Sequence, residues 1–437
     1  MKEASTIFAL SSAPGRAGVA VIRVSGPAAR QTLEMMTGRL PEPRFAAFRT
    51  IKHPKTGDVL DRAVVVWFAA PKTETGEDIV EFQVHGSRAV ITALLSALGE
   101  IAGCRLARPG EFARRAFENG KLDLAEIEGL ADLIEAETEA QRRQALAQTS
   151  GSLSNLYDGW RTRLIEIAAL VEAAIDFSDE GDVSASAFNE ARKRAETLQK
   201  EIAAHLDDGH RGEILREGFR VALLGPPNAG KSSLLNALAR REAAIVSAEA
   251  GTTRDVIEVR LDLAGLAVIV SDTAGIREAS SDVEREGIRR SLAAARDADL
   301  VLWLAENPES IPPLNFSRET SLAIRSKQDL ALDSDFDGLA VSAKTGAGID
   351  QLIAEIAKRA SEAVGSATEP ALTRARHREA LENTLDDIGA FLNGPPGPVE
   401  LRAEDVRRAA HALGRITGRV DVEDVLDQIF SRFCIGK

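Results

Sequence analysis

One segment near the middle of the chain strongly limits the folds that this sequence can adopt. The strand pattern Arg220–Leu224 leads into the loop Gly225–Ser233, which has the pattern G-x-x-x-x-G-K-S, and a helical pattern follows over Leu234–Arg241. A glycine-rich loop between a strand and a helix wraps its backbone N–H groups around a phosphate, and the helix N-terminus adds partial positive charge. The sequence therefore predicts a phosphate-binding loop within a parallel α/β domain.

Two residues of this loop would make the strongest contacts with a bound nucleotide. Lys231 is expected to contact the β- and γ-phosphates, and the Ser232 hydroxyl is expected to bind Mg²⁺. A glycine-rich turn that happens to precede a lysine is the alternative, but strand, loop and helix follow one another in the required order. The loop residues predicted to bind nucleotide are Asn228, Ala229, Gly230, Lys231, Ser232 and Ser233.

The character of the chain changes three times along its length. Residues 1–119 are rich in apolar or alternating runs punctuated by glycine and proline, and residues 120–216 have a helical period. Short buried strands alternate with helices over residues 217–364, and the helical period returns over 365–437, where the last pattern covers Val422–Phe433. Because these last helices are too few for a core of their own, we predict one discontinuous helical domain with an α/β domain inserted between its halves.

Composition excludes several classes of function. The chain has 437 residues, a net charge of -13 and 4% aromatic residues, so an RNA partner must be met by a local basic patch or through a second protein. No stretch approaches the roughly 18 apolar residues of a membrane helix, and the start of the chain has no signal-peptide pattern. The chain has only two cysteines, which is typical of a reducing cytoplasm.

Three further motifs separate a GTPase from an ATPase, and the first two would serve the metal and the γ-phosphate. In the loop Gly251–Asp255 we select Thr253 as the threonine that completes the Mg²⁺ shell. After the strand pattern Leu266–Val270, Asp272 is expected to hold the metal through a water molecule, and Gly275 to sense the γ-phosphate. Asp272 and Gly275 are the ends of a D-x-x-G motif, and Thr273 and Ala274 lie between them.

The third motif, Ser326-Lys327-Gln328-Asp329, would select the guanine base. The Asp329 carboxylate can accept hydrogen bonds from both guanine N1–H and N2–H₂, a donor pair that adenine lacks. A backbone N–H of Ser342-Ala343-Lys344, after the strand pattern Leu339–Val341, would bind guanine O6. Ser326 stands where GTPases usually have asparagine, which weakens the brace between this base loop and the phosphate loop. The other residues of the base loop are Lys327 and Gln328.

The position after the D-x-x-G motif departs from the Ras-like pattern. Ras-like enzymes orient the attacking water with a glutamine there, whereas this chain has Ile276, which cannot bond water. Another carboxylate or amide must orient the water, and positive charge must replace an arginine finger. Arg254 and Arg277 are candidate fingers, but both fit equally well as solvated residues.

With these motifs and several others, the chain resembles the MnmE (TrmE) family of bacterial tRNA modification GTPases over essentially its whole length. The further matching segments are Pro14–Gly26, Gly76–Phe82, Arg108–Phe112, Asn119–Leu124 and Phe433–Lys437. The resemblance implies a multidomain fold of α/β plus α type. It would comprise an N-terminal α+β domain that binds folate and forms a homodimer, a discontinuous helical domain, and an inserted Ras-like P-loop G domain.

The resemblance also implies a function and a second site. The family adds a carboxymethylaminomethyl-type group to the wobble uridine of certain tRNAs, in a heterotetramer with the flavin-carrying partner MnmG (GidA). Arg23, Glu81, Lys121 and Lys437 fall on the family's positions for a one-carbon derivative of tetrahydrofolate. Arg and Lys suit the glutamate tail, and Glu81 suits the donors of the pterin ring. Judged without the resemblance, Arg23 and Glu81 are better explained as ordinary strand residues.

The resemblance further places K⁺ beside the phosphates, where its charge would replace that of an arginine finger. Its predicted ligands are Asn228, Ser247, Glu249 and Thr252, and the family has threonine where this chain has Ser247. The neighbouring residues Ala248, Ala250 and Gly251 are expected to border the nucleotide. Glu284 matches the glutamate that orients the catalytic water, although on its own it fits a solvated residue at a helix start.

A regulatory or ribosome-assembly GTPase, similar to Era or Der, is the alternative from a different class. Era-like proteins add a KH module and Der carries two G domains. This chain has one G domain and no G-x-x-G motif in a KH-like setting. The sequence therefore favours the tRNA-modifying GTPase.

Overall fold

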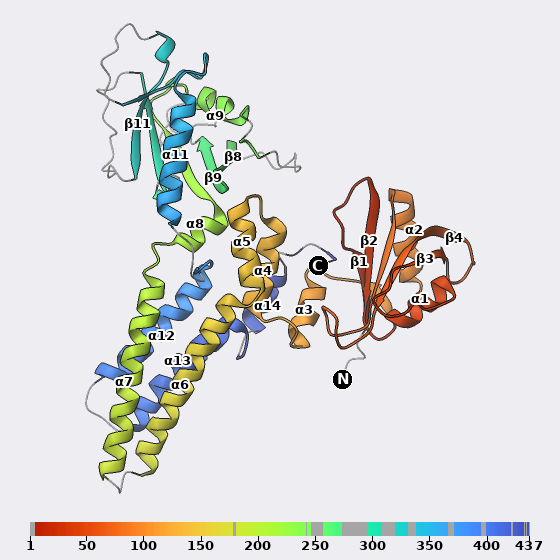
Figure 1. The fold of residues 1–437 in the computed structure, drawn as a ribbon, viewed down its shortest axis with the longest axis horizontal. Helices are drawn as coiled ribbons and strands as arrows, with labels where there is room; N and C mark the ends of the chain where they lie inside the picture. The colour runs from red at the N-terminus through yellow and green to blue at the C-terminus, as the bar shows by residue number, and fades with distance from the viewer. Residues whose placement is uncertain are drawn as a thin grey trace, which may run out of the picture. The chain divides into compact units, whose positions relative to one another are not determined.

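The computed structural model describes residues 5–177, 181–241, 243–245, 257–272, 296–306, 320–330, 338–365, 371–394, 399–420, 423–431, 433 and 435–436 (Figure 1). The chain divides into two compact units, one formed by residues 1–131 with 414–437 and the other by residues 132–413. These divisions differ from the predicted boundaries at residues 119, 216 and 364, which stay predictions. Among the described residues, no helix combines the length and apolar character needed to cross a membrane.

The first unit is built on a six-stranded sheet of order β3-β4-β5-β2-β1-β6. Its strands are β1 (Thr6–Leu10), β2 (Ala17–Ser25), β3 (Ala47–Lys52), β4 (Val59–Phe68), β5 (Ile79–Gly86) and β6 (Cys104–Leu106). Neighbouring strands are antiparallel, except that β6 runs parallel to β1. Because side chains alternate between the two faces of a strand, Ile22, Val24 and Phe82 face one side, where α1 (Ala29–Thr37) and α2 (Arg88–Gly99) bury them.

Residues from both ends of the chain complete this unit. Helices α3 (Glu111–Glu118), α4 (Leu124–Glu135) and α14 (Glu423–Phe430) share an apolar cluster in which Phe430 and Phe433 pack together. The helix predicted to reach Phe433 ends at Phe430, because the chain then turns to pair Ile435 with Pro109 in an isolated β-bridge. The Ser11 hydroxyl donates to the Gly436 carbonyl at 2.9 Å, so the segment after α14 is held by the first unit.

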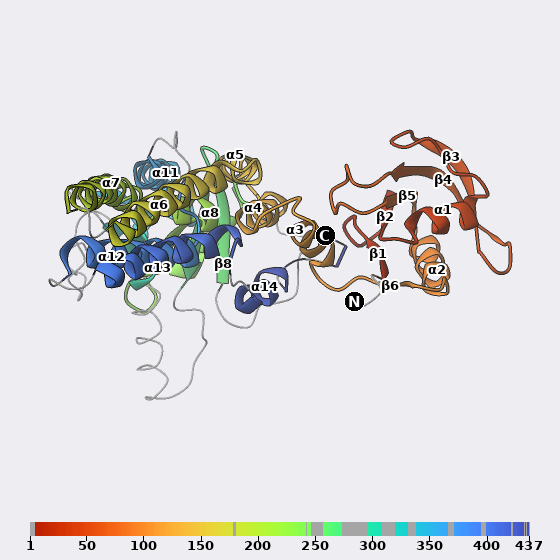
Figure 2. The same ribbon diagram turned by 90° about the horizontal axis from the view of Figure 1, so that it is seen from below.

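The second unit contains long helices and a second sheet. The helices are α5 (Glu139–Thr149), α6 (Ser152–Asp176), α7 (Gly181–Leu206), α8 (Arg211–Glu217), α12 (Ala375–Asn393) and α13 (Val399–Thr417). In both views α6 and α7 lie side by side (Figures 1 and 2). The predicted apolar period explains this packing, because Leu164, Ile167 and Val171 lie on one face of α6 and are fully buried.

The second sheet also has six strands, in the order β12-β11-β10-β7-β9-β8. They are β7 (Phe219–Leu224), β8 (Ile257–Leu263), β9 (Leu266–Asp272), β10 (Leu300–Ala305), β11 (Ser321–Arg325) and β12 (Leu339–Ala340), with helices α9 (Lys231–Ala239) and α11 (Ile349–Val364). All neighbours are parallel except β8 and β9. This arrangement confirms the predicted α/β fold, although α9 begins three residues earlier than the pattern suggested.

The segments that lead into and out of the second sheet are joined to each other. Asp132, at the C-terminal part of α4, accepts hydrogen bonds from Arg216 Nε at 3.1 Å and from Arg374 Nη2 at 2.6 Å. Arg216 precedes β7, and Arg374 precedes α12. A Cβ atom on Gly212 would lie 2.3 Å from the Leu372 carbonyl oxygen, so α8 and the outgoing segment are in close contact.

Candidate active site

The phosphate loop follows β7 and has a backbone that few residues can adopt. Gly225 has a φ of 146°, and a Cβ atom there would lie 2.1 Å from the Leu304 carbonyl oxygen of β10, so only glycine fits. Asn228 and Gly230 also have positive φ angles, 63° and 93°. Asparagine is one of the few non-glycine residues that tolerate this conformation. These turns bring the loop back to the first turn of α9, where helix N–H groups are free to meet a phosphate.

Lys231 lies at the start of α9 and is buried, with 8% of the residue exposed. Its ammonium group donates to the Gly225 carbonyl at 2.8 Å and to the Pro226 carbonyl at 3.0 Å. Burial lowers the pKa of Lys231, while the charge of Asp272 opposes that change. The positive charge is thus held at the phosphate loop, at the position from which it would meet the β- and γ-phosphates.

Two oxygen donors for a divalent metal meet beside this lysine. The Ser232 hydroxyl, in the first turn of α9, donates to Asp272 Oδ2 at 2.6 Å, and Asp272 ends the neighbouring strand β9. Asp272 is 1% exposed, so its carboxylate faces the interior of the site. Hydroxyl and carboxylate oxygens are ligands that Mg²⁺ prefers, directly or through water. These two residues therefore fit the metal predicted for them.

The predicted base loop lies after β11, at the same edge of the sheet. Ser342 Oγ donates to Asp329 Oδ1 at 2.7 Å, and this bond is the main reason that the pKa of Asp329 lies below its ordinary value. Asp329 is thus a carboxylate at neutral pH, as guanine recognition requires. The Ser342 N–H donates to the Ala347 carbonyl at 2.9 Å, which leaves the N–H groups of Ala343 and Lys344 as candidates for guanine O6.

Ser326 is the one unusual residue of this loop. Its side chain is buried, with 5% of the residue exposed, and its N–H donates to the Ala305 carbonyl at 2.9 Å. Within the described part of the chain, its hydroxyl has no hydrogen-bond partner. That Ser326 weakens the brace between the base loop and the phosphate loop stays a prediction. Lys327, with a φ of 54°, pairs with Glu306, and Gln328 donates its N–H to the Val341 carbonyl at 3.1 Å.

A further group of predicted residues lies outside the described residues, so their roles stay predictions. From the first switch these are Ser247, Ala248, Glu249, Ala250, Gly251, Thr252 and Thr253. From the second switch and the chain end they are Thr273, Ala274, Gly275, Glu284 and Lys437. Arg254, Ile276 and Arg277 lie outside the description as well.

The predicted folate residues lie in the first unit, and two of them are in direct contact. Arg23 on β2 and Glu81 on β5 are register partners in adjacent antiparallel strands. Arg23 Nη2 donates to Glu81 Oε1 at 3.0 Å. Lys121 lies next to the loop between β4 and β5, since a Cβ atom on Gly76 would be 3.0 Å from Lys121 Cε. Glu74 of the same loop accepts from Arg23 Nη1 at 2.7 Å, so this loop connects the three residues.

This geometry bears on one part of the prediction, which stays a prediction. Arginine suits the glutamate tail of the folate and Glu81 suits its pterin ring, and these are opposite ends of an elongated molecule. Because the two side chains are bonded to each other, both would contact the same end of a ligand. The sequence could not reveal this, because it does not give the register between β2 and β5.

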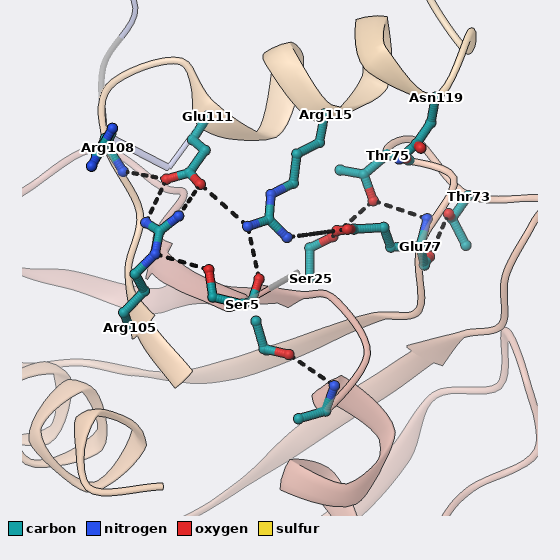
Figure 3. Close-up of polar contacts among 12 residues, drawn as sticks. Ser5, Ser25, Thr73, Thr75, Glu77, Arg105, Arg108, Glu111, Arg115 and Asn119 are labelled. Carbon is teal, nitrogen blue, oxygen red and sulfur yellow. Dashed lines mark hydrogen bonds and ion pairs between the residues drawn. The ribbon is translucent and has the colours of Figure 1, made fainter. Parts of the chain in front are cut away.

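A partly buried polar network extends from this site along α3, and the sequence did not predict it (Figure 3). Ser25 donates to Glu77 Oε2 at 2.7 Å, and Arg115 Nη1 reaches the same carboxylate at 3.0 Å. Arg115 also donates to Glu111, which is paired with Arg105. The signals in the sequence were the matching segments Pro14–Gly26, Gly76–Phe82 and Arg108–Phe112, which contain Ser25, Glu77 and Glu111.

The charges of this network are held firmly. Burial by itself would raise the pKa of Glu111, but hydrogen bonds from Arg105 and from the Arg108 N–H, with the charge of Arg115, lower it to about 2. A cavity of about 700 Å³ borders these residues, between α3 and α14. Its lining is Ser5, Glu77, Arg105, Arg108, Pro109, Glu111, Arg114, Arg115, Glu118, Asn119, Asp427, Phe430 and Ser431. Arginines and carboxylates alternate there, so the cavity carries no excess of either charge.

Comparison with known proteins identifies relatives over the whole chain. The family model described as the MnmE helical domain matches residues 124–434, and the model described as the N-terminus of the GTP-binding protein TrmE matches residues 6–121. Three similar relatives are each described as tRNA modification GTPase MnmE. The relative from Parvibaculum lavamentivorans is 54% identical, over 99% of this chain and 100% of its own. The relatives from Azorhizobium caulinodans and Methylobacterium radiotolerans are 52% and 50% identical. Each match covers 100% of this chain and 100% of the relative.

The resemblance predicted from the motifs is thereby confirmed. The helical-domain match covers most of the chain, and the relatives align with it from end to end. The chain belongs to the MnmE family of tRNA modification GTPases.

Proposed function

We propose that this chain hydrolyses GTP in the modification of the wobble uridine of certain tRNAs, adding a carboxymethylaminomethyl-type group together with an MnmG-like flavoprotein. The observation that carries the GTPase assignment is the meeting of Lys231, Ser232 and Asp272 at one edge of the parallel sheet. Ligands of α/β proteins bind at the carboxyl ends of such strands. The family name supplies the tRNA substrate.

The residues of the G domain would each have a separate role in GTP hydrolysis. Lys231 binds the phosphates, while Ser232 and Asp272 hold Mg²⁺, which when bound neutralises charge on the β- and γ-phosphates. Asp329, fixed by Ser342, selects guanine. K⁺ held by Asn228, Ser247, Glu249 and Thr252 would supply the charge of a missing arginine finger, and Glu284 would orient the water.

The first unit would bind a one-carbon derivative of tetrahydrofolate and form the homodimer. Arg23, Glu81 and Lys121 support this proposal, because the loop between β4 and β5 brings an arginine, a carboxylate and a lysine together. Lys437 would complete the pocket. The homodimer and two copies of the flavoprotein would form a heterotetramer in the cytoplasm.

The decisive experiment measures the wobble uridine itself. A strain that lacks this gene should accumulate tRNA without the modification, and mass spectrometry of its nucleosides should show the group return when the gene is restored. A copy that carries Lys231→Ala should fail to restore it, because the phosphates lose their cation. Unchanged modification in the deletion strain, with altered ribosomal subunits, would instead support the Era-like or Der-like alternative.

A further inference from the structure

The guanidinium group of Arg23 is shared between two carboxylates. Its Nε and Nη2 atoms donate to Glu81 Oε1 at 3.2 and 3.0 Å, and its Nη1 atom donates to Glu74 Oε2 at 2.7 Å. The side chains of Arg23 and Glu81 are 19% and 17% exposed, whereas that of Glu74 is 43% exposed. One positive charge thus faces two negative charges, and the more accessible one belongs to Glu74.

The two carboxylates are held in different ways. Glu81 lies on β5 directly opposite Arg23 on β2, so the sheet itself fixes their distance. Glu74 lies in the loop between β4 and β5. This loop is fixed at the next residue, Thr75. Thr75 is fully buried and its hydroxyl lies 2.7 Å from that of Ser25, while Asn119 donates to the Thr75 carbonyl at 2.7 Å. The loop therefore presents the Glu74 side chain to Arg23 without burying it.

Arg23 does not need Glu74 in order to stay in place. Glu81 already bonds the Nε and Nη2 edge, and the guanidinium carbon lies 5.9 Å from the centre of the Phe112 ring. Nη1 bonds the more exposed of the two carboxylates, so it is the donor that a ligand oxygen could take with the least disturbance. The Glu74 carboxylate therefore takes up a donor rather than orienting it.

We propose that Glu74 is a gate residue of the folate site: it occupies Arg23 Nη1, and an acceptor oxygen of the ligand displaces it on binding. This inference rests on the proposed folate function. A folate carries carboxylates, so Glu74 opposes it twice, by competing for the donor and by repelling its charge. An exposed ion pair is cheap to break, so the gate weakens binding without preventing it.

The test compares the binding of 5-formyltetrahydrofolate to four forms of the full-length protein by isothermal titration. Glu74→Gln should bind about threefold to fivefold more tightly than the unaltered chain, the range for removing one exposed ion-pair competitor. Glu34→Gln is the matched control, because Glu34 is 45% exposed and pairs with Arg30 at 3.7 Å in the same unit. It removes the same charge away from Arg23 and should change affinity little. Arg23→Gln should bind more weakly.

The results distinguish the proposed role of Glu74 from the proposed folate site as a whole. Equal or weaker binding by Glu74→Gln would overturn the gate, and so would an equal gain in Glu34→Gln, because charge alone would then explain the effect. The folate function would survive both results, provided that Arg23→Gln weakens binding. If the unaltered chain does not bind the ligand, or if Arg23→Gln binds equally well, the proposed folate site itself is wrong and the gate falls with it.

Discussion

The two six-stranded sheets hold their candidate functional residues in different places. In the largely parallel sheet of the second unit, Lys231, Asp272 and Asp329 lie at or beyond the ends of strands, where loops can carry short motifs. In the largely antiparallel sheet of the first unit, Arg23 and Glu81 lie within strands and meet across the register. The first arrangement leaves a local signature in the sequence, whereas the second becomes visible only when the strands are paired.

The difference also affects how a substitution acts. A residue in a loop at the edge of a parallel sheet can be changed with little effect on the sheet, so its loss reports on ligand binding. A residue within a strand is coupled to its cross-strand partner, so its loss changes both groups.

The largest effect is expected at Asp272. Asp272→Asn removes the charge that would hold Mg²⁺, so GTP binding and hydrolysis should fall together, with kcat/KM reduced on the order of 100-fold or more. Glu284→Ala should instead lower kcat with little change in KM, because that residue would touch only the attacking water. Steady-state kinetics at saturating Mg²⁺ distinguish the two, and a large rise in KM for the Glu284 variant would contradict its role.

The next effect concerns the segment after α14. Removal of Phe433–Lys437 should weaken folate binding at least about 30-fold, the loss of charge-assisted hydrogen bonds worth ~2 kcal/mol, while GTP hydrolysis in the second unit stays near normal. Isothermal titration and a phosphate-release assay measure the two.

A point variant controls for packing, because Phe433 is 7% exposed and its loss alone would disturb the first unit. Lys437→Ala keeps Phe433 and the bridge between Ile435 and Pro109. If Lys437→Ala binds folate as well as the unaltered chain while the truncated chain does not, the segment only packs, and Lys437 is not part of the site.

A cation effect is expected in the second unit. Hydrolysis in KCl should exceed hydrolysis in NaCl at equal ionic strength by about tenfold, because K⁺ would supply a fixed charge to the transition state. Asn228→Ala should remove the difference while nucleotide binding through Lys231 and Asp329 largely survives. Equal rates in the two salts would exclude a K⁺ site. If the difference persists in the Asn228 variant, the cation has other ligands.

The sequence predicted the strands of the second sheet more fully than it predicted the candidate site of the first unit. The strands expected at Arg220–Leu224 and Leu266–Val270 are present, and each extends by only one or two residues. The network through Ser25, Glu77 and Arg115 was missed because its partners are 52 and 38 positions apart in the chain. The end of α14 was also misplaced, because a helical pattern cannot show that the following segment turns to contact another part of the unit.

The smallest effect is expected at Ser326, which stands where GTPases usually have asparagine. Ser326→Asn should strengthen binding of GDP and GTP by about threefold to fivefold, since a longer amide can supply a hydrogen bond between the base loop and the phosphate loop. Dissociation of a fluorescent GDP analogue, followed by stopped flow, should slow in proportion.

Ser326→Ala tests the role of the serine hydroxyl directly. Because the Ser326 hydroxyl is buried without a hydrogen-bond partner among the described residues, its removal breaks no bond and should leave the dissociation rate within about twofold of the unaltered chain. Lys231 and Asp329 are unchanged in both variants, so phosphate and base recognition are constant. Faster release by the alanine variant would mean that the hydroxyl does brace the loop when nucleotide is bound. Unchanged release by the asparagine variant would mean that the gap between the two loops is too wide for an amide to bridge.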